Sequence, residues 1–175
     1  FAAARQDQPA LSANQVRSVL GTIQQALGAE KDLRVQDALT VALASACDIP
    51  NSRLEGVQSR AAETLAKSVG ELALRQGAAP GGYDPLLRAG KALFDLVSNE
   101  SIRLEQSALI EAAGFAGDVL TRARRRIDAG IAEDKSDERA DLALAVGQAT
   151  RVYFFAHKDL GGTPIEVKLD DFVAG

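Results

Sequence analysis

Two stretches of the chain, residues 30–38 and 100–108, have the sequence of variants of one helix start. Each has a polar turn, an aliphatic–arginine doublet and a run that contains alanine, and their offset is constant, since 102 − 33 and 103 − 34 are both 69. An internal repeat of helices indicates stacked helical units and a binding surface rather than a catalytic pocket. The aligned positions are Gly21 with Gly90, Leu27 with Leu96, Leu33 with Ile102 and Arg34 with Arg103.

The composition favours one helical domain. Of the 175 residues, 46% are hydrophobic and 25% are charged, so the chain can bury a sizeable core. Only 5% are aromatic and none is tryptophan or methionine, so alanine and leucine, which favour helix, supply most of the apolar surface. We expect an all-α fold of about six helices in stacked antiparallel pairs, an α–α superhelix, with a compact helical bundle as the alternative.

Helix-start signals divide the chain. Ser12 and Ser52 each begin a capping box, and Asp84 before Pro85 is typical of an N-cap and a first helical residue. With the apolar spacing, these signals predict helices that begin near 12, 31, 52, 84 and 101, the last running to about 130, and a sixth after the polar stretch 132–136. The second helix is expected to bury a wide apolar face: Val35, Ala38, Leu39, Val41, Ala42, Leu43, Ala44 and Ala46.

The clearest break in the chain is the glycine-rich stretch 77–83. We expect one helical domain, 1–160, made of two repeat units, about 12–76 and 84–157, that this linker joins. Residues 161–175 form the C-terminal tail, in which apolar and polar side chains alternate with the period of a strand. In an otherwise helical chain we expect an extended tail that lies on the helices or leads onward.

The formal net charge of −4 argues against nucleic-acid binding, which needs a basic face. One basic run exists, formed by Arg122 and by 124–126. At a helix C-terminus such cations suit the helix dipole, and a patch for an anionic partner is the alternative. No run approaches the roughly 20 apolar residues of a membrane span. A first residue that is Phe1 rather than Met predicts a processed product or a piece of a larger protein; a cytoplasmic location is slightly favoured and export stays open.

Single copies of cysteine and histidine limit the chemistry. Cys47 lies in an apolar run, which predicts a buried, inert thiol. His157 is expected at a helix C-terminus, with a general-base role as the alternative, and it leaves a His/Cys metal site short of ligands. The acidic cluster suits the N-terminus of the sixth helix. We therefore expect no metal, no cofactor and no catalytic residues. The cluster comprises Asp134, Asp137, Glu138 and Asp141.

The densest aromatic patch is 153–155 on the sixth helix. Tyr153 is expected in the core, whereas Phe155 falls on the side of Arg151. An exposed Phe155 beside Arg151 would suit a protein contact, because aromatic and arginine side chains dominate interface energies. Packing under the tail is the alternative. The candidate interaction surface comprises Arg122, Arg125, Arg126, Arg151 and Phe155.

The two aliphatic–arginine doublets give the chain a family resemblance. Each doublet follows a polar turn and a shorter helix, and residues 12–47 and 84–120 in this way resemble HEAT-like and armadillo-like helical repeats. The proline usual in the outer helix of that family is absent, and the offset of 69 exceeds the family's roughly 40, which a third helix per unit would explain. The resemblance implies a right-handed stack of helices with a concave face that binds another macromolecule.

The sequence thus predicts a non-catalytic protein–protein interaction or scaffold module with a protein partner. The alternative is a helical bundle that binds a small ligand as a sensor, with Phe115 and the glycines of the long helix lining a pocket. An enzyme is the third reading, for which no clustered catalytic groups are visible in the sequence.

Overall fold

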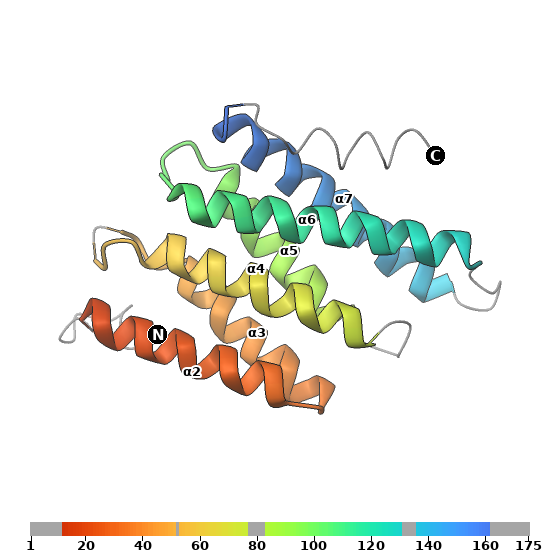
Figure 1. Ribbon diagram of the computed structural model, residues 1–175, viewed down its shortest axis with the longest axis horizontal. Coiled ribbons are helices and arrows are strands. Elements are labelled where there is room, and N and C mark those ends of the chain that lie inside the picture. Colours follow the sequence, from red (N-terminus) through yellow and green to blue (C-terminus); the bar gives the residue numbers. More distant parts are fainter. Residues whose placement is uncertain (1–11, 52, 77–82, 131–135, 162–175) are drawn as a thin grey trace.

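The computed structural model describes residues 12–51, 53–76, 83–130 and 136–161; for 70–76 and 136 it describes the backbone alone. Within these ranges the chain is all-helical, as predicted, and forms six helices (Figure 1). The predicted tail, 161–175, lies outside the described residues apart from Gly161. The helices are α2 (Ala13–Ala29), α3 (Leu33–Cys47), α4 (Val57–Gln76), α5 (Asp84–Val97), α6 (Gln106–Asp128) and α7 (Ser136–Asp159).

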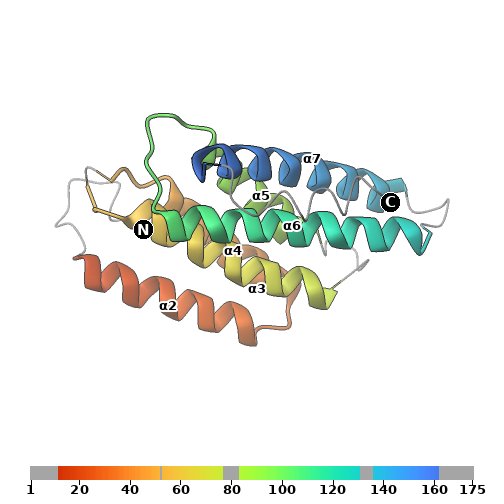
Figure 2. The same cartoon turned by 45° about the horizontal axis from the view of Figure 1, so that its top comes forward.

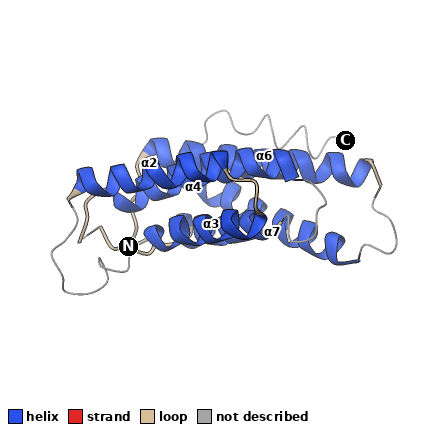
Figure 3. Cartoon of the chain, turned by 90° about the horizontal axis from the view of Figure 1, so that it is seen from below, coloured by secondary structure: helices blue, strands red, loops and turns tan. Residues whose placement is uncertain are grey.

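The helices form two layers. The first layer holds α2, α4 and α6, which run in one direction, and the second holds α3, α5 and α7, which run in the opposite direction (Figure 1 and Figure 3). Figure 2 shows the same order of helices from a second angle. Each helix packs on neighbours in its own layer and in the other, whereas α2 and α3 make no close contact with the described parts of α6 or α7. The result is the predicted stack of antiparallel pairs.

The stacking unit is a pair of helices rather than the repeat of 69 residues. The pairs begin at Ala13, Val57 and Gln106, so 57 − 13 and 106 − 57 give spacings of 44 and 49 residues. The offset of 69 instead relates α2 to α5 and α3 to α6, which lie in opposite layers. The division into units 12–76 and 84–157 therefore does not match the stack, because α4 packs on α5 across that boundary.

Local hydrogen bonds explain where the first two helices begin. The capping box predicted at Ser12 is confirmed: the Gln15 backbone N–H donates to the Ser12 hydroxyl at 3.3 Å, and the Ser12 N–H donates to the Gln15 side chain at 2.8 Å. Asp32 caps α3 by accepting a hydrogen bond of 2.8 Å from the Arg34 N–H.

Three predicted helix starts are wrong. α4 begins at Val57 rather than near Ser52, because residues 53–56 form turns that end in Gly56, whose φ of +69° is left-handed; Ser52 itself lies outside the described residues. α5 has Tyr83 at its N-cap, so Asp84 is its first helical residue. α6 begins at Gln106 rather than 101, after a segment that is not helical.

The buried face of α3 differs from the predicted one. Val35 and Val41 are 42% and 40% exposed, whereas Gln36 and Thr40 are buried beside Leu43. The polar pair is tolerated because the Gln36 amide donates to the carbonyl of Glu30, and the Thr40 hydroxyl donates to the carbonyl of Gln36, both at 2.8 Å. Neighbouring helices cover only one side of α3, so the other part of its apolar arc stays in solvent.

Candidate interaction groove

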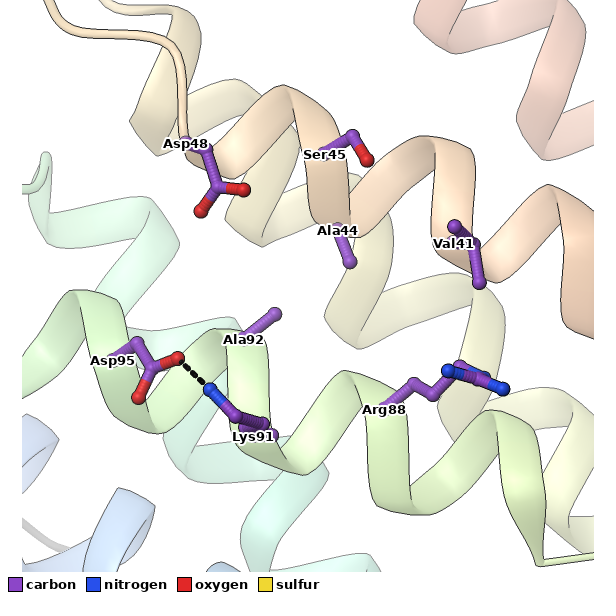
Figure 4. Close-up of a pocket in the computed structure, with 8 residues that line it drawn as sticks. All are labelled: Val41, Ala44, Ser45, Asp48, Arg88, Lys91, Ala92 and Asp95. Atoms are coloured by element: carbon purple, nitrogen blue, oxygen red, sulfur yellow. Dashed lines mark hydrogen bonds and ion pairs between the residues drawn. The ribbon is translucent and has the colours of Figure 1, made fainter.

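A groove of about 220 Å³ runs between α3 and α5 in the second layer (Figure 4). Both helices pack on α4 from the inner side, and the groove opens on the outer side. Ala44 and Ala92 have short side chains at its centre, with the exposed side chain of Val41 at one end. We call this feature the α3/α5 groove; it is lined by Val41, Ala44, Ser45, Asp48, Arg88, Lys91, Ala92 and Asp95.

The two walls of the groove are equivalent stripes of neighbouring helices. Each lining residue of α5 lies 47 positions after its counterpart on α3, since 88 − 41, 91 − 44, 92 − 45 and 95 − 48 all give 47. Positions i, i+3, i+4 and i+7 share one face of a helix, so each wall is a single stripe. The groove is thus a product of the stacking of helix pairs, and the sequence repeat of 69 residues could not reveal it.

Ion pairs border the groove. The Arg88 guanidinium donates to the Asp37 carboxylate across the α3–α5 seam, and the Lys91 ammonium donates to Asp95 within α5, both at 2.5 Å. These hydrogen bonds raise the pKa of Arg88 and of Lys91. Because the side chains of Arg88 and Lys91 are 51% and 70% exposed, the pairs add little to stability and can exchange partners at small cost.

A larger hollow of about 540 Å³ continues the groove at the C-terminal ends of α3 and α5. It shares Asp48, Ala92 and Asp95 with the groove, so the two form one continuous depression. We call it the end hollow. Its remaining lining comes from the helix ends and from the turns that follow them: Cys47, Pro50, Asn51, Gln58, Leu96, Asn99, Ser101 and Ile102.

Among the residues of the predicted surface, Arg126 is held by the fold. Its guanidinium makes two hydrogen bonds to the Glu138 carboxylate, at 2.6 and 3.1 Å, and a third of 3.2 Å to the carbonyl of Gly130. These bonds raise the pKa of Arg126. The Glu138 side chain is only 7% exposed, and its charge, after burial, raises the pKa of Tyr83. Arg126 therefore joins the end of α6 to the start of α7.

The other arginines of the basic run separate. Arg125 is exposed near the end of α6, whereas Arg122 is half-buried, and burial lowers its pKa. Arg126 contacts Glu138 on α7, and Arg151 lies 13 residues further along that helix (151 − 138), about 20 Å at the helical rise. The predicted surface is therefore divided between the two ends of α7.

Arg151 and Phe155 belong to a seam between α5 and α7. The Arg151 guanidinium lies 5.6 Å from the ring centroid of Phe94, and Phe155 packs on Phe94 with ring centroids 6.0 Å apart. Phe155 is half-buried against the core, while Phe154, at 62% exposure, is the exposed aromatic residue of the patch. Tyr153 is buried, as predicted.

The single cysteine and histidine do not line one common site. The burial predicted for Cys47 is confirmed, and burial raises the pKa of its thiol to about 12. His157 lies in the last turn of α7, as predicted, with its Nδ1 buried and without a hydrogen-bond partner. Phe115, which the ligand-pocket alternative invoked, is buried in the core.

The acidic cluster is only partly visible. Asp134 lies outside the described residues, Asp137 and Glu138 lie in the first turn of α7 as expected, and Glu138 is paired with Arg126. Over the part of the chain that the structure describes, no three His, Cys, Asp or Glu side chains are grouped so that they could hold a metal ion.

Comparisons with protein-family models, curated proteins and solved structures give no significant match to this chain. None of the described helices is both long enough and apolar enough to cross a membrane. The fold and the α3/α5 groove are therefore the observations on which a function can be proposed.

Proposed function

We propose that this chain is a non-catalytic interaction module that binds a partner protein in the α3/α5 groove. The observation that carries the proposal is the groove itself, which has small apolar residues at its centre, an exposed valine at one end and charged residues along both walls. An apolar centre with a polar rim is the usual anatomy of a protein interface.

The architecture supports the same proposal. Helix pairs spaced 44 and 49 residues apart fall near the roughly 40–47 residues of HEAT-like and armadillo-like repeats, which supports that resemblance more than the offset of 69 does. Stacked pairs build extended surfaces from repeated stripes, and such surfaces serve to bind other macromolecules. The neighbouring α5–α7 seam, with Arg151 and the exposed Phe154, extends the surface beside the groove.

Two valines of α3 provide a matched test. Val41 lines the groove and is 40% exposed, whereas Val35 is 42% exposed and lies outside it. In extracts of the source cells, we expect a partner that cross-links to the native chain to be lost with Val41→Glu and retained with Val35→Glu, because only Val41→Glu places a charge in the groove. Quantitative mass spectrometry of the cross-linked material measures the difference.

The stability of both variants is measured by urea unfolding, so that a loss of fold is distinguished from a loss of binding. A partner that both variants retain would show that the α3/α5 groove is not the interface. Cross-linking that both folded variants lose equally would place the interface on α3 without the groove.

A further inference from the structure

Building on the proposed function, we infer that the partner segment in the α3/α5 groove is a helix that places a basic side chain, lysine or arginine, in the end hollow. The end hollow is lined by two carboxylates, Asp48 and Asp95, and neither an arginine nor a lysine belongs to its described lining. A cationic side chain is therefore the charge-complementary occupant of this end of the depression.

The two helix ends reinforce the negative charge. α3 and α5 run in the same direction, so the negative ends of both helix dipoles meet at the end hollow. Neither helix has a basic residue in its last turn, whereas α6 has Arg125 and Arg126 there and α7 has His157 and Lys158. In place of a cation, Asp48 is the C-cap of α3 and Asp95 lies in the last turn of α5.

Such acidic helix ends contradict the usual charge preference of a helix. Cations stabilise the C-terminal turn, and carboxylates destabilise it. A local rule that a sequence breaks is characteristic of a functional position. The cation that the two helix ends lack within the chain is the one that the partner segment supplies.

The shape of the groove selects a helix. Each wall is a stripe from one helix, and the stripe from Arg88 to Asp95 spans about 10 Å, or two helical turns. An amphipathic helix lays residues i, i+3 and i+4 into such a groove. A helix that runs antiparallel to α3 and α5 brings its own positive N-terminal end to the end hollow, so its basic residue lies in its N-terminal half.

Lys91 does not block this binding. Its ammonium pairs with Asp95, but it is the most exposed side chain of the ion pairs at the groove, at 70%. A partner cation can take over Asp95 while Lys91 turns to solvent or to an acidic residue of the partner, because an exposed pair of this kind contributes little to stability.

The probe for this inference is a phage-displayed library of 18-residue helix-forming peptides in which both ends vary in charge. The library is selected on the full chain, and enriched peptides are synthesised and titrated by fluorescence anisotropy. We expect the peptides whose binding Val41→Glu abolishes, and Val35→Glu does not, to carry lysine or arginine in their N-terminal half. For these peptides, Asp95→Asn and Asp48→Asn each raise Kd by about tenfold.

Asp84→Asn is the matched control, because Asp84 is an exposed carboxylate at the opposite end of α5, and it leaves Kd within about twofold. Asp95 is 53% exposed, so Asp95→Asn tests the inference even where Asp48→Asn alters the end of α3. Peptides that need Val41 but neither a basic residue nor Asp95 would overturn the basic-side-chain inference and leave the proposed function standing. Failure to enrich any peptide that needs Val41 would count against both.

Discussion

Gly90 determines how closely α5 and α7 approach. A Cβ atom at this position would lie 2.6 Å from Oε1 and 3.3 Å from Cβ of Gln148 on α7, which is closer than packed carbon atoms come. Gly114, in the interior of α6, has open space where its Cβ would be. The two helical glycines therefore have opposite meanings: Gly90 allows a close helix contact, and Gly114 has no packing role that the described structure shows.

Alanine substitutions separate these meanings. We expect Gly90→Ala to lower the free energy of unfolding by about 1 kcal/mol, since an overpacking cost of about 1–3 kcal/mol exceeds the gain in helix propensity of about 1 kcal/mol. Gly114→Ala should raise it by about 0.5–1 kcal/mol. Urea unfolding measures both, and in Gly90→Ala with Gln148→Ala the loss should shrink. A stabilised Gly90→Ala would show that Gln148 yields without cost.

Cys47 makes stability depend on alkaline pH. Burial, and then the charge of Asp48, raise the pKa of the thiol to about 12 from an ordinary value of 9.0. Between these values the unfolded chain loses the thiol proton and the native chain keeps it. The free energy of unfolding therefore falls as pH rises from 9 to 12, by up to about 1.4 kcal/mol per pH unit from this group.

Cys47→Ala isolates this contribution, because it removes the thiol and leaves the other alkaline groups. Urea unfolding of both chains at pH 8 and pH 10.5 should show a steeper loss of stability with pH in the native sequence. Equal slopes in the two proteins would mean that the thiol ionises inside the fold near its ordinary pKa.

At the scale of the element, the contact of Arg126 with Glu138 fastens one helix end to the next helix start. Both carboxylate oxygens of the nearly buried Glu138 accept from the Arg126 guanidinium. Arg126→Ala leaves that carboxylate buried without its ion pair, so we expect faster amide hydrogen exchange in the first two turns of α7.

Arg125→Ala is the control for this prediction, because Arg125 is the next residue of α6 and is exposed. It should leave exchange in α7 unchanged, whereas Glu138→Gln, which keeps the shape of the side chain, should give a smaller increase than Arg126→Ala. Hydrogen-exchange mass spectrometry resolves the three cases. Equal exchange in all variants would mean that packing alone holds the start of α7.

Local chemistry made some element ends predictable and left others out of reach. The capping box at Ser12 is formed within four residues, so the sequence contains all of its parts. The doublets Leu33-Arg34 and Ile102-Arg103 look alike, yet the first begins α3 and the second precedes α6 in a non-helical segment. The segment before α6 is tied by a long-range bond, in which the Glu105 N–H donates to the Ser59 hydroxyl at 2.9 Å, and no local pattern encodes that partner.

The same limit applies to the site. Of the predicted surface, Arg126 is consumed by an ion pair and Phe155 by core packing, because burial of each depends on a helix distant in sequence. The groove residues carry a signal of their own, the spacing i, i+3, i+4, i+7 repeated after 47 positions. That signal has little sequence identity, since only Asp48 and Asp95 match, so a search for similar residues passes over it.

At the scale of the whole molecule, contact is restricted to neighbours. The pair α2–α3 makes no close contact with α6 or α7 among the described residues, and α4 and α5 connect the two ends. In such stacks, stability is close to a sum of local terms and interfaces between neighbours. Damage to one end should therefore stay there.

Two leucine truncations at opposite ends test this. Leu20 on α2 and Leu120 on α6 are 3% and 4% exposed, so each change to alanine should cost about 2–5 kcal/mol. We expect the double variant to be additive within about 0.5 kcal/mol, because the two helices share no contact. Hydrogen exchange should rise in α2–α4 for Leu20→Ala and in α4–α7 for Leu120→Ala. Exchange that rises over the whole chain in either variant would indicate one cooperative unit.

The position of the groove between successive helix pairs has a mechanical consequence. One wall belongs to the pair α2–α3 and the other to the pair α4–α5, and the Arg88–Asp37 ion pair crosses between them on the outer side. The width of the groove is thus a measure of the tilt between two links of a short chain of links. Whatever fills the groove acts as a wedge, and the curvature of the whole stack changes with it.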